Sequence, residues 1–145
     1  MKIKMFENFI FNDFSLVEDT NKYHMGQLIF HKFTVKNAPF INIFLHESIM
    51  SQDYITRLFD YLSWLGTKSG DALIKYYNEN IARSKISQVD LNWYINLECV
   101  YIKITINEDS KINSTIHCIT RSGDDLDIAL TEKEIIHMGY RIVYG

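Results

Sequence analysis

The feature that most constrains the fold is a segment from Ser51 to about Lys85 that follows a helical repeat, between two arms that follow a strand repeat. Ser51 can cap a first helix, and Gly66 offers the left-handed conformation that ends one. Apolar residues between them recur at three- and four-residue steps, which predicts one buried stripe: Tyr54, Ile55, Leu58, Phe59, Leu62 and Leu65. A second helix is predicted from Ser69 or Asp71, and the short connection predicts an antiparallel helical hairpin.

Both arms contain segments in which apolar and polar residues alternate, as in half-buried strands. We predict strands at residues 9–14, 27–36, 40–45, 99–106, 114–121, 126–130 and 141–144, the first with an uncertain register, with a loop at 137–139. In the clearest strand, Val100, Ile102, Ile104 and Ile106 are predicted to share one face. The order of strands, two helices and strands predicts an α+β fold, with a single antiparallel β-sheet and a central helical hairpin packed on one face.

Length and composition favour one domain over residues 1–145. The chain is 47% hydrophobic, with a single proline and six glycines, so no stretch has the composition of a flexible linker. Its apolar runs are shorter than the roughly 20 residues that span a bilayer, and Glu7 interrupts the start before any run of signal-peptide length. We therefore expect a cytoplasmic protein with no membrane partner.

The sheet face opposite the helices needs a covering, because Phe30, Phe40 and Phe44 are predicted to lie near it. Two alternatives remain open. An N-terminal arm containing Phe6, Phe9 and Phe11 can fold across them, or the aromatic face can receive a partner.

The residues that usually carry chemistry do not form a recognisable motif. The five histidines have no metal-ligand spacing, and the chain has no nucleophile or phosphate-binding motif. Cys99 and Cys118 can be buried free thiols or form one disulfide. We predict no metal, no cofactor and no catalytic residue, although distant residues such as His117, Glu98 and Asp90 could meet in space.

Charge is distributed unevenly along the chain. Residues 1–86 contain ten Lys or Arg and nine Asp or Glu, a net charge of +1, whereas residues 87–145 contain five and nine, a net charge of −4. A pI of about 5.9 disfavours nucleic acid as a partner. The turn that carries Asp124, Asp125 and Asp127 is a candidate rim for a basic protein partner; alternatively, these acids only solvate a hairpin turn.

Two aromatic residues, Trp93 and Tyr94, lie among polar residues just before the clearest strand. Exposed Trp and Tyr side chains often anchor protein interfaces, so both are candidate partner-binding residues. Packing as part of the core is an equal alternative.

The strand, helix-pair and meander pattern, together with the segment Leu97-Glu98-Cys99-Val100-Tyr101-Ile102-Lys103-Ile104, resembles small α+β immunity proteins of bacterial polymorphic and contact-dependent inhibition toxin systems. The resemblance implies a protein that is not an enzyme. It implies a monomer or weak homodimer that binds and blocks a cognate toxin domain, often a nuclease. The rival classes are a self-associating accessory protein and a small enzyme without a recognisable motif.

Overall fold

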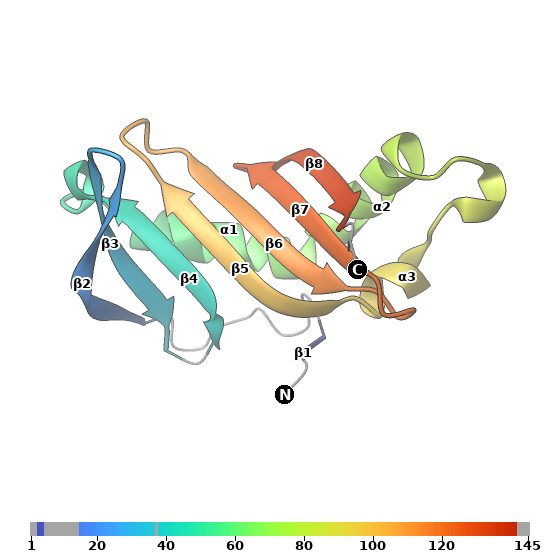
Figure 1. Ribbon diagram of the computed structural model, residues 1–145, viewed down its shortest axis with the longest axis horizontal. Helices are drawn as coiled ribbons and strands as arrows, with labels where there is room; N and C mark the ends of the chain where they lie inside the picture. Colours follow the sequence, from blue (N-terminus) through green and yellow to red (C-terminus); the bar gives the residue numbers. More distant parts are fainter. Residues whose placement is uncertain (1–2, 5–14, 37, 142–145) are drawn as a thin grey trace.

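A computed structural model describes residues 3–4, 15–36 and 38–141, which form a mixed α+β fold built on one large sheet (Figure 1). Seven strands follow the order β2-β3-β4-β5-β6-β7-β8, and β1 pairs with β5 outside this path. The strands are β1 (Ile3–Lys4), β2 (Leu16–Met25), β3 (Leu28–Val35), β4 (Ala38–His46), β5 (Glu98–Ile106), β6 (Ile112–Ile119), β7 (Asp125–Thr131) and β8 (Glu134–Tyr140). The helices are η1 (Glu47–Ile49), α1 (Ile55–Thr67), α2 (Ser69–Asn80), η2 (Lys85–Ser87) and α3 (Leu91–Ile95).

The prediction of a purely antiparallel sheet is wrong at one place, the pairing of β4 with β5. These strands run parallel, with Ile43 opposite Ile104, while the other pairs are antiparallel. The helices between them carry the chain back along the sheet, so β5 enters beside β4 in the same direction. This crossover joins a three-stranded meander, β2 to β4, to a four-stranded one, β5 to β8.

The predicted antiparallel helical hairpin is also wrong. Only Lys68 separates α1 from α2, which is too short a connection for the chain to reverse. Figure 1 shows α1 behind the central strands and α2 farther on, near β8. The first helix starts at Ile55 rather than at Ser51, and it continues through Gly66 to Thr67.

The hydrophobic core lies between the sheet and the helices. Ile41, Ile43 and Leu45 of β4 are buried, as are Ile102, Ile104 and Ile106 of β5, and they belong to one cluster with Leu58, Leu62, Leu65 and Leu73 of the helices. The predicted stripe is therefore largely confirmed. It is wrong for Ile55 and Phe59, which remain 47% and 38% exposed.

Three details of the strands differ from the sequence prediction. The register shifts between Cys99 and Tyr101, so Val100 is 43% exposed instead of sharing the buried face of Ile102. The long strand β2 is absent from the prediction because its polar residues, from Glu18 to Lys22, conceal the alternation. Residues 137–139 belong to β8 rather than to a loop. The predicted strand at 9–14 falls outside the described residues, as do residues 142–144 of the predicted strand at 141–144, and Arg141 is not in a strand.

No helix in the described part of the chain is both long and apolar enough to cross a membrane.

Candidate functional site

The candidate site is the sheet face that points away from α1, which we call the open face. Figure 1 shows α1 behind strands β4, β5, β6 and β7, and none of the described helices crosses the front of these strands. Directly paired residues on adjacent strands point to the same face, so the register places Tyr101, His117 and Asp127 in one row across β5, β6 and β7. The next row contains Lys103, Thr115 and Ala129.

The first row holds a cluster of polar side chains, which we call the His–Arg cluster: Tyr101, His117, Asp125, Asp127 and Arg141. Nε2 of His117 lies 2.7 Å from Oδ1 of Asp125. The imidazole meets the Tyr101 ring edge to face, with centroids 5.5 Å apart. Arg141 donates to both carboxylate oxygens of Asp127, over 3.1 and 2.8 Å, and this bonding raises the pKa of the guanidinium.

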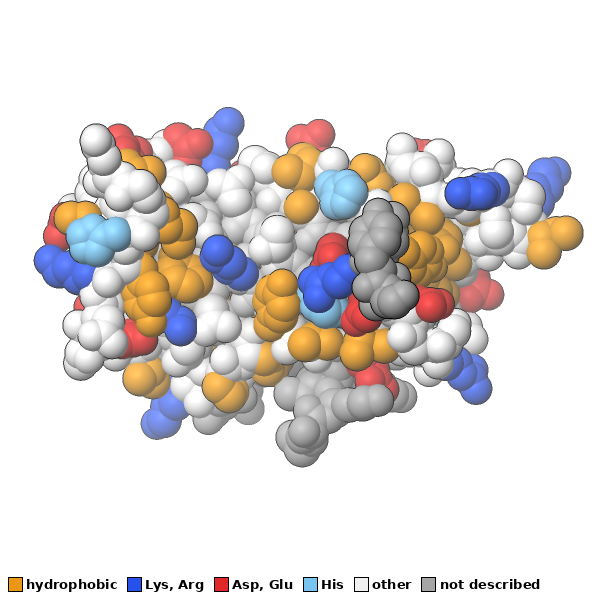
Figure 2. All heavy atoms as spheres, viewed as in Figure 1, with side chains coloured by type: hydrophobic (Ala, Val, Ile, Leu, Met, Phe, Trp, Pro, Cys, Tyr) orange, Lys and Arg blue, Asp and Glu red, His pale blue; other side chains and the backbone are white. Residues whose placement is uncertain are grey.

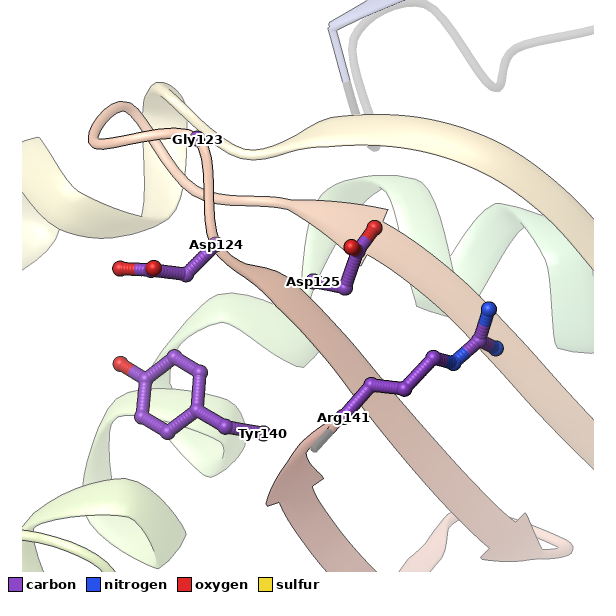
Figure 3. Close-up of a pocket in the computed structure, with 5 residues that line it drawn as sticks. All are labelled: Gly123, Asp124, Asp125, Tyr140 and Arg141. Carbon is purple, nitrogen blue, oxygen red and sulfur yellow. The ribbon is translucent and has the colours of Figure 1, made fainter. Parts of the chain in front are cut away.

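The three predicted acids of the turn therefore have different surroundings. Asp125 lies within hydrogen-bond distance of His117, whereas Asp127 forms an ion pair with Arg141, so both carboxylates have a side-chain partner. Among the described residues, the Asp124 carboxylate has no ion-pair or hydrogen-bond partner. Figure 3 shows it directed away from Asp125 and beside Tyr140. Within the part of the chain that the structure describes, the turn thus presents one carboxylate without a side-chain partner instead of three.

A pocket of about 350 Å³ lies at this end of the sheet, between the turn and the end of β8, and is lined by Gly123, Asp124, Asp125, Tyr140 and Arg141 (Figure 3). Gly123 has φ of 90°, a conformation that side chains rarely adopt, and this lets the chain turn sharply into β7. Burial raises the pKa of Tyr140, helped by its hydrogen bond to the Tyr77 hydroxyl at 2.6 Å. The pocket therefore combines two carboxylates and an arginine with a phenol whose pKa is raised.

A second hollow, of about 280 Å³, lies near the middle of the open face. It is lined by Lys103, Thr105, Asn113, Ser114, Thr115, Ala129, Leu130 and Ile136. Small side chains form it because Thr115 lies between Lys103 and Ala129 in the register. Figure 2 shows this part of the face as uncharged polar and backbone atoms, with hydrophobic and charged groups around it.

Beside the hollow, two lysines flank one aromatic ring. The ammonium of Lys103 lies 5.3 Å from the centroid of Phe44, and that of Lys32 lies 5.9 Å from it and 5.4 Å from that of Tyr23. Within the described residues, neither lysine has a carboxylate within ion-pair distance. The open face therefore carries cations as well as the acids that the sequence emphasised.

Trp93 and Tyr94 lie away from the open face, on α3. Asp90 starts this helix by accepting hydrogen bonds from the amides of Asn92 and Trp93. The Trp93 ring packs against Tyr77 of α2, with centroids 4.9 Å apart. Tyr94 lies so close to Gly70 that a Cβ there would be 2.9 Å from its ring. Both side chains are half-buried, as expected if they pack on the core, and their role in a partner interface stays a prediction.

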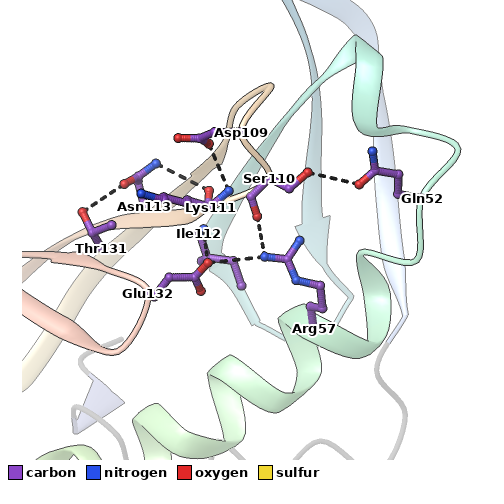
Figure 4. A network of polar contacts seen from close by, with 9 residues as sticks. All are labelled: Gln52, Arg57, Asp109, Ser110, Lys111, Ile112, Asn113, Thr131 and Glu132. Carbon is purple, nitrogen blue, oxygen red and sulfur yellow. Dashed lines mark hydrogen bonds and ion pairs between the residues drawn. The ribbon is translucent and has the colours of Figure 1, made fainter.

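A separate network has a structural role (Figure 4). Arg57 of α1 donates to the carbonyl of Ser110 and to Glu132, at 3.4 Å from the carboxylate. Ser110 also bonds Gln52, while Glu132 accepts from the amide of Ile112. Ser110 and Glu132 both have positive φ, 62° and 52°, an uncommon conformation that these bonds help to hold. One arginine thus ties the start of α1 to two turns of the meander.

The described residues contain no group of three or more His, Cys, Asp or Glu side chains that could hold a metal ion. His117 meets Asp125, rather than the Glu98 or Asp90 considered from the sequence. Cys99 and Cys118 lie opposite one another on β5 and β6 as free, buried thiols. Burial raises the pKa of Cys99 to about 12 and raises that of Cys118 as well.

Sequence reasoning missed the His117–Asp125 pair and the role of Arg141. A signal for the first was present, because a hairpin turn at residues 120–124 brings the two ends of β6 and β7 together. Arg141 follows β8 and reaches Asp127 through the pairing of β7 with β8. That pairing could not be placed while residues 137–139 were interpreted as a loop.

Comparison with known proteins gives no match: no family model, no curated protein and no solved structure is detectably similar to this chain.

Proposed function

We propose that this protein is a toxin-neutralising immunity protein that binds its cognate toxin domain through the open face. The observation that carries the proposal is that face: broad, exposed and set with aromatic and charged side chains, on a sheet whose other face is filled by helices. The architectural resemblance described above supplies the class of partner and is an argument by analogy.

The chemistry of the open face suits a protein partner. Phe44 and Tyr101 offer aromatic anchors, and the half-exposed Arg141 and Lys103 surround them with charge. Aromatic residues and arginine are enriched where protein interfaces carry most of their binding energy. The broad surface would cover a toxin's active site or substrate surface without any catalysis by this chain.

The test begins with the product of a gene encoded beside this one, expressed together with this protein and purified as a complex. Thr115→Arg places a long charged side chain at the centre of the open face, so we expect it to weaken binding by at least about tenfold. Glu79→Arg adds the same side chain at an exposed position of α2 and serves as the matched control. Equal binding by both variants would show that the open face is not the binding surface. If no product of a neighbouring gene binds, the immunity role loses its support.

The acidic turn is tested in the same complex by association kinetics. Of the three acids in the turn, only Asp124 has a carboxylate without a side-chain partner among the described residues. Asp124→Asn therefore tests long-range attraction without removing a local contact. If the turn steers a basic toxin, this variant and the Asp124, Asp125 and Asp127 triple Asn variant both associate more slowly than wild type, and the difference shrinks at high salt. Association rates equal to those of wild type at both low and high salt would show that the turn does not contribute to the interface.

The predicted contact of Trp93 and Tyr94 with a partner needs conservative variants, because both rings pack against α2 or its start. Trp93→Phe and Tyr94→Phe keep an aromatic ring in place while removing the indole NH or the hydroxyl. A loss of affinity with unchanged unfolding would place them in the interface. Unchanged affinity would leave them as packing residues.

Self-association is the second candidate, and the edge strand β8 favours it. In the strand order of the described residues β8 is the last strand, and Ile136 and Tyr140 on it are exposed. An edge of this kind can pair with a second copy. Sedimentation velocity over a range of concentrations distinguishes the two candidates. A stable homodimer that dissociates in the Ile136→Lys variant would favour self-association. A monomer at every concentration would favour the immunity proposal.

A further inference from the structure

The hollow in the open face has the chemistry of an anion site. None of its eight lining residues is acidic, and one, Lys103, is a cation. Of the acids in the neighbouring rows, Asp127 is already bonded to Arg141, and Glu134, opposite Thr131, lies outside the lining. An anion entering the hollow would therefore meet positive charge without an opposing carboxylate in its lining.

The hollow also offers uncommitted hydrogen-bond donors. Among the described residues, the hydroxyls of Thr105 and Thr115 make no side-chain hydrogen bond. Asn113 is held in place, because its amide oxygen accepts from Thr131 at 3.1 Å and its amide nitrogen donates to the carbonyl of Lys111 at 3.5 Å (Figure 4), so the uncommitted donors are the two threonine hydroxyls. Hydroxyl donors beside a lysine are groups from which oxyanions accept hydrogen bonds.

Lys103 lies at the border of the hollow, where its side chain can reach either Phe44 or the hollow itself. Its ammonium rests over Phe44 on β4, while its side chain lines the hollow over β5 and β6. Lysine has a flexible four-carbon stem, so the ammonium can swing from the ring to the hydroxyls of Thr105 and Thr115. A cation–π contact is weak where water reaches it, so the contact with Phe44 is readily exchanged for an ion pair.

We propose that this hollow binds a single oxyanion group, a phosphate or a carboxylate, with Lys103 as its ion-pair partner and Thr105 and Thr115 as hydrogen-bond donors. The site is a property of the isolated chain and stands independently of the toxin. In a complex, the same chemistry would receive an acidic side chain of the partner.

The experiment is a two-dimensional amide NMR titration of the full-length purified protein with inorganic phosphate and, separately, with acetate. Sodium chloride is adjusted to keep ionic strength constant, because unspecific attraction is screened by salt. We expect saturable shifts centred on residues 103, 105 and 115, with a dissociation constant on the order of 1 mM. Saturation by only one of the two anions identifies which oxyanion the site takes.

Two lysine variants provide the matched comparison. Lys103→Gln should weaken binding by at least about fivefold, whereas Lys32→Gln, which removes the other lysine over Phe44 but does not line the hollow, should leave it within about twofold. Thr115→Val should weaken binding while Lys103 remains. The proposal is overturned if shifts do not saturate, if they scatter over the surface, or if both lysine variants lose binding equally.

Discussion

The two faces of this sheet are built from the same strands but satisfy their side chains in different ways. On the helix-covered face, Ile43, Ile104 and their neighbours are buried against α1, and their contribution comes from removing apolar surface from water. On the open face, Lys103, His117 and Arg141 are held by ring contacts, a hydrogen bond and an ion pair, with Lys103 and Arg141 exposed and His117 buried. Stability should therefore depend on the first face, and binding on the second.

The largest effect should follow a change in the covered face. Leu62 is fully buried at the centre of α1, so Leu62→Ala should lower the free energy of unfolding by about 2–5 kcal/mol. Ile55→Ala, on the exposed side of the same helix, is the control and should cost much less. Denaturant unfolding of both variants measures the contrast, and a loss below about 0.5 kcal/mol for Leu62→Ala would contradict the assignment of the core.

Alkaline pH should also act through the covered face. Burial raises the pKa of Tyr61, which bonds the Ser114 hydroxyl, to about 12. Because the unfolded chain loses this proton near pH 10 while the folded chain retains it, stability is full below pH 10 and falls as pH rises toward 12. The loss should be on the order of 2 kcal/mol.

Urea unfolding between pH 9 and pH 12 measures this dependence. Tyr61→Phe removes the titrating group, so its stability should fall less steeply over the same range. Identical slopes for the variant and wild type would show that Tyr61 is not responsible.

Arg57 connects the covered face to the turns of the meander and should have an intermediate effect. Arg57→Ala leaves the carbonyl of Ser110 and the carboxylate of Glu132 without this donor, so we expect a loss of about 1–2 kcal/mol. Lys133→Ala breaks only an exposed pair with Asp60 and should stay within about 0.5 kcal/mol. Equal losses would show that Arg57 is no more than a surface charge.

The smallest effect on stability should come from the open face. Lys103→Gln removes an exposed charge from β5 and should change the free energy of unfolding by no more than about 0.5 kcal/mol. The adjacent Ile104→Ala, on the covered face, should cost about 2–5 kcal/mol. Thermal unfolding of the two variants compares the two faces within one strand. A large loss of stability in Lys103→Gln would contradict the view that stability depends mainly on the covered face.

Much of the fold could be predicted because burial leaves a periodic trace in the sequence. Leu58, Leu62 and Leu65 recur at helical spacing, and Ile102, Ile104 and Ile106 recur at strand spacing, and all six are buried as predicted. Val100 was misplaced because a one-residue bulge reverses the face of a strand without any change in composition. The strand β2 was missed because its residues are mostly polar and exposed.

The candidate site was less predictable, since it depends on pairs that only the register creates. The acids of the turn were visible as a cluster, but the hairpin turn alone does not fix the register that brings Asp125 to His117, and no local signal shows that Asp127 meets Arg141. The hollow around Thr115 is likewise invisible in sequence, because it arises from small side chains on three adjacent strands. Neither feature has a characteristic spacing along the chain.

The sequence by itself determined a mixed α+β chain, most of its buried positions and its uneven charge, because these follow from local periodicity and composition. The tertiary structure alone decided that β4 and β5 run parallel, that α2 extends past α1 instead of folding back, and which charges are compensated. The physical reason is that strand order, crossover direction and ion pairing depend on residues that are distant in sequence, where no local repeat records which side chain will lie opposite another.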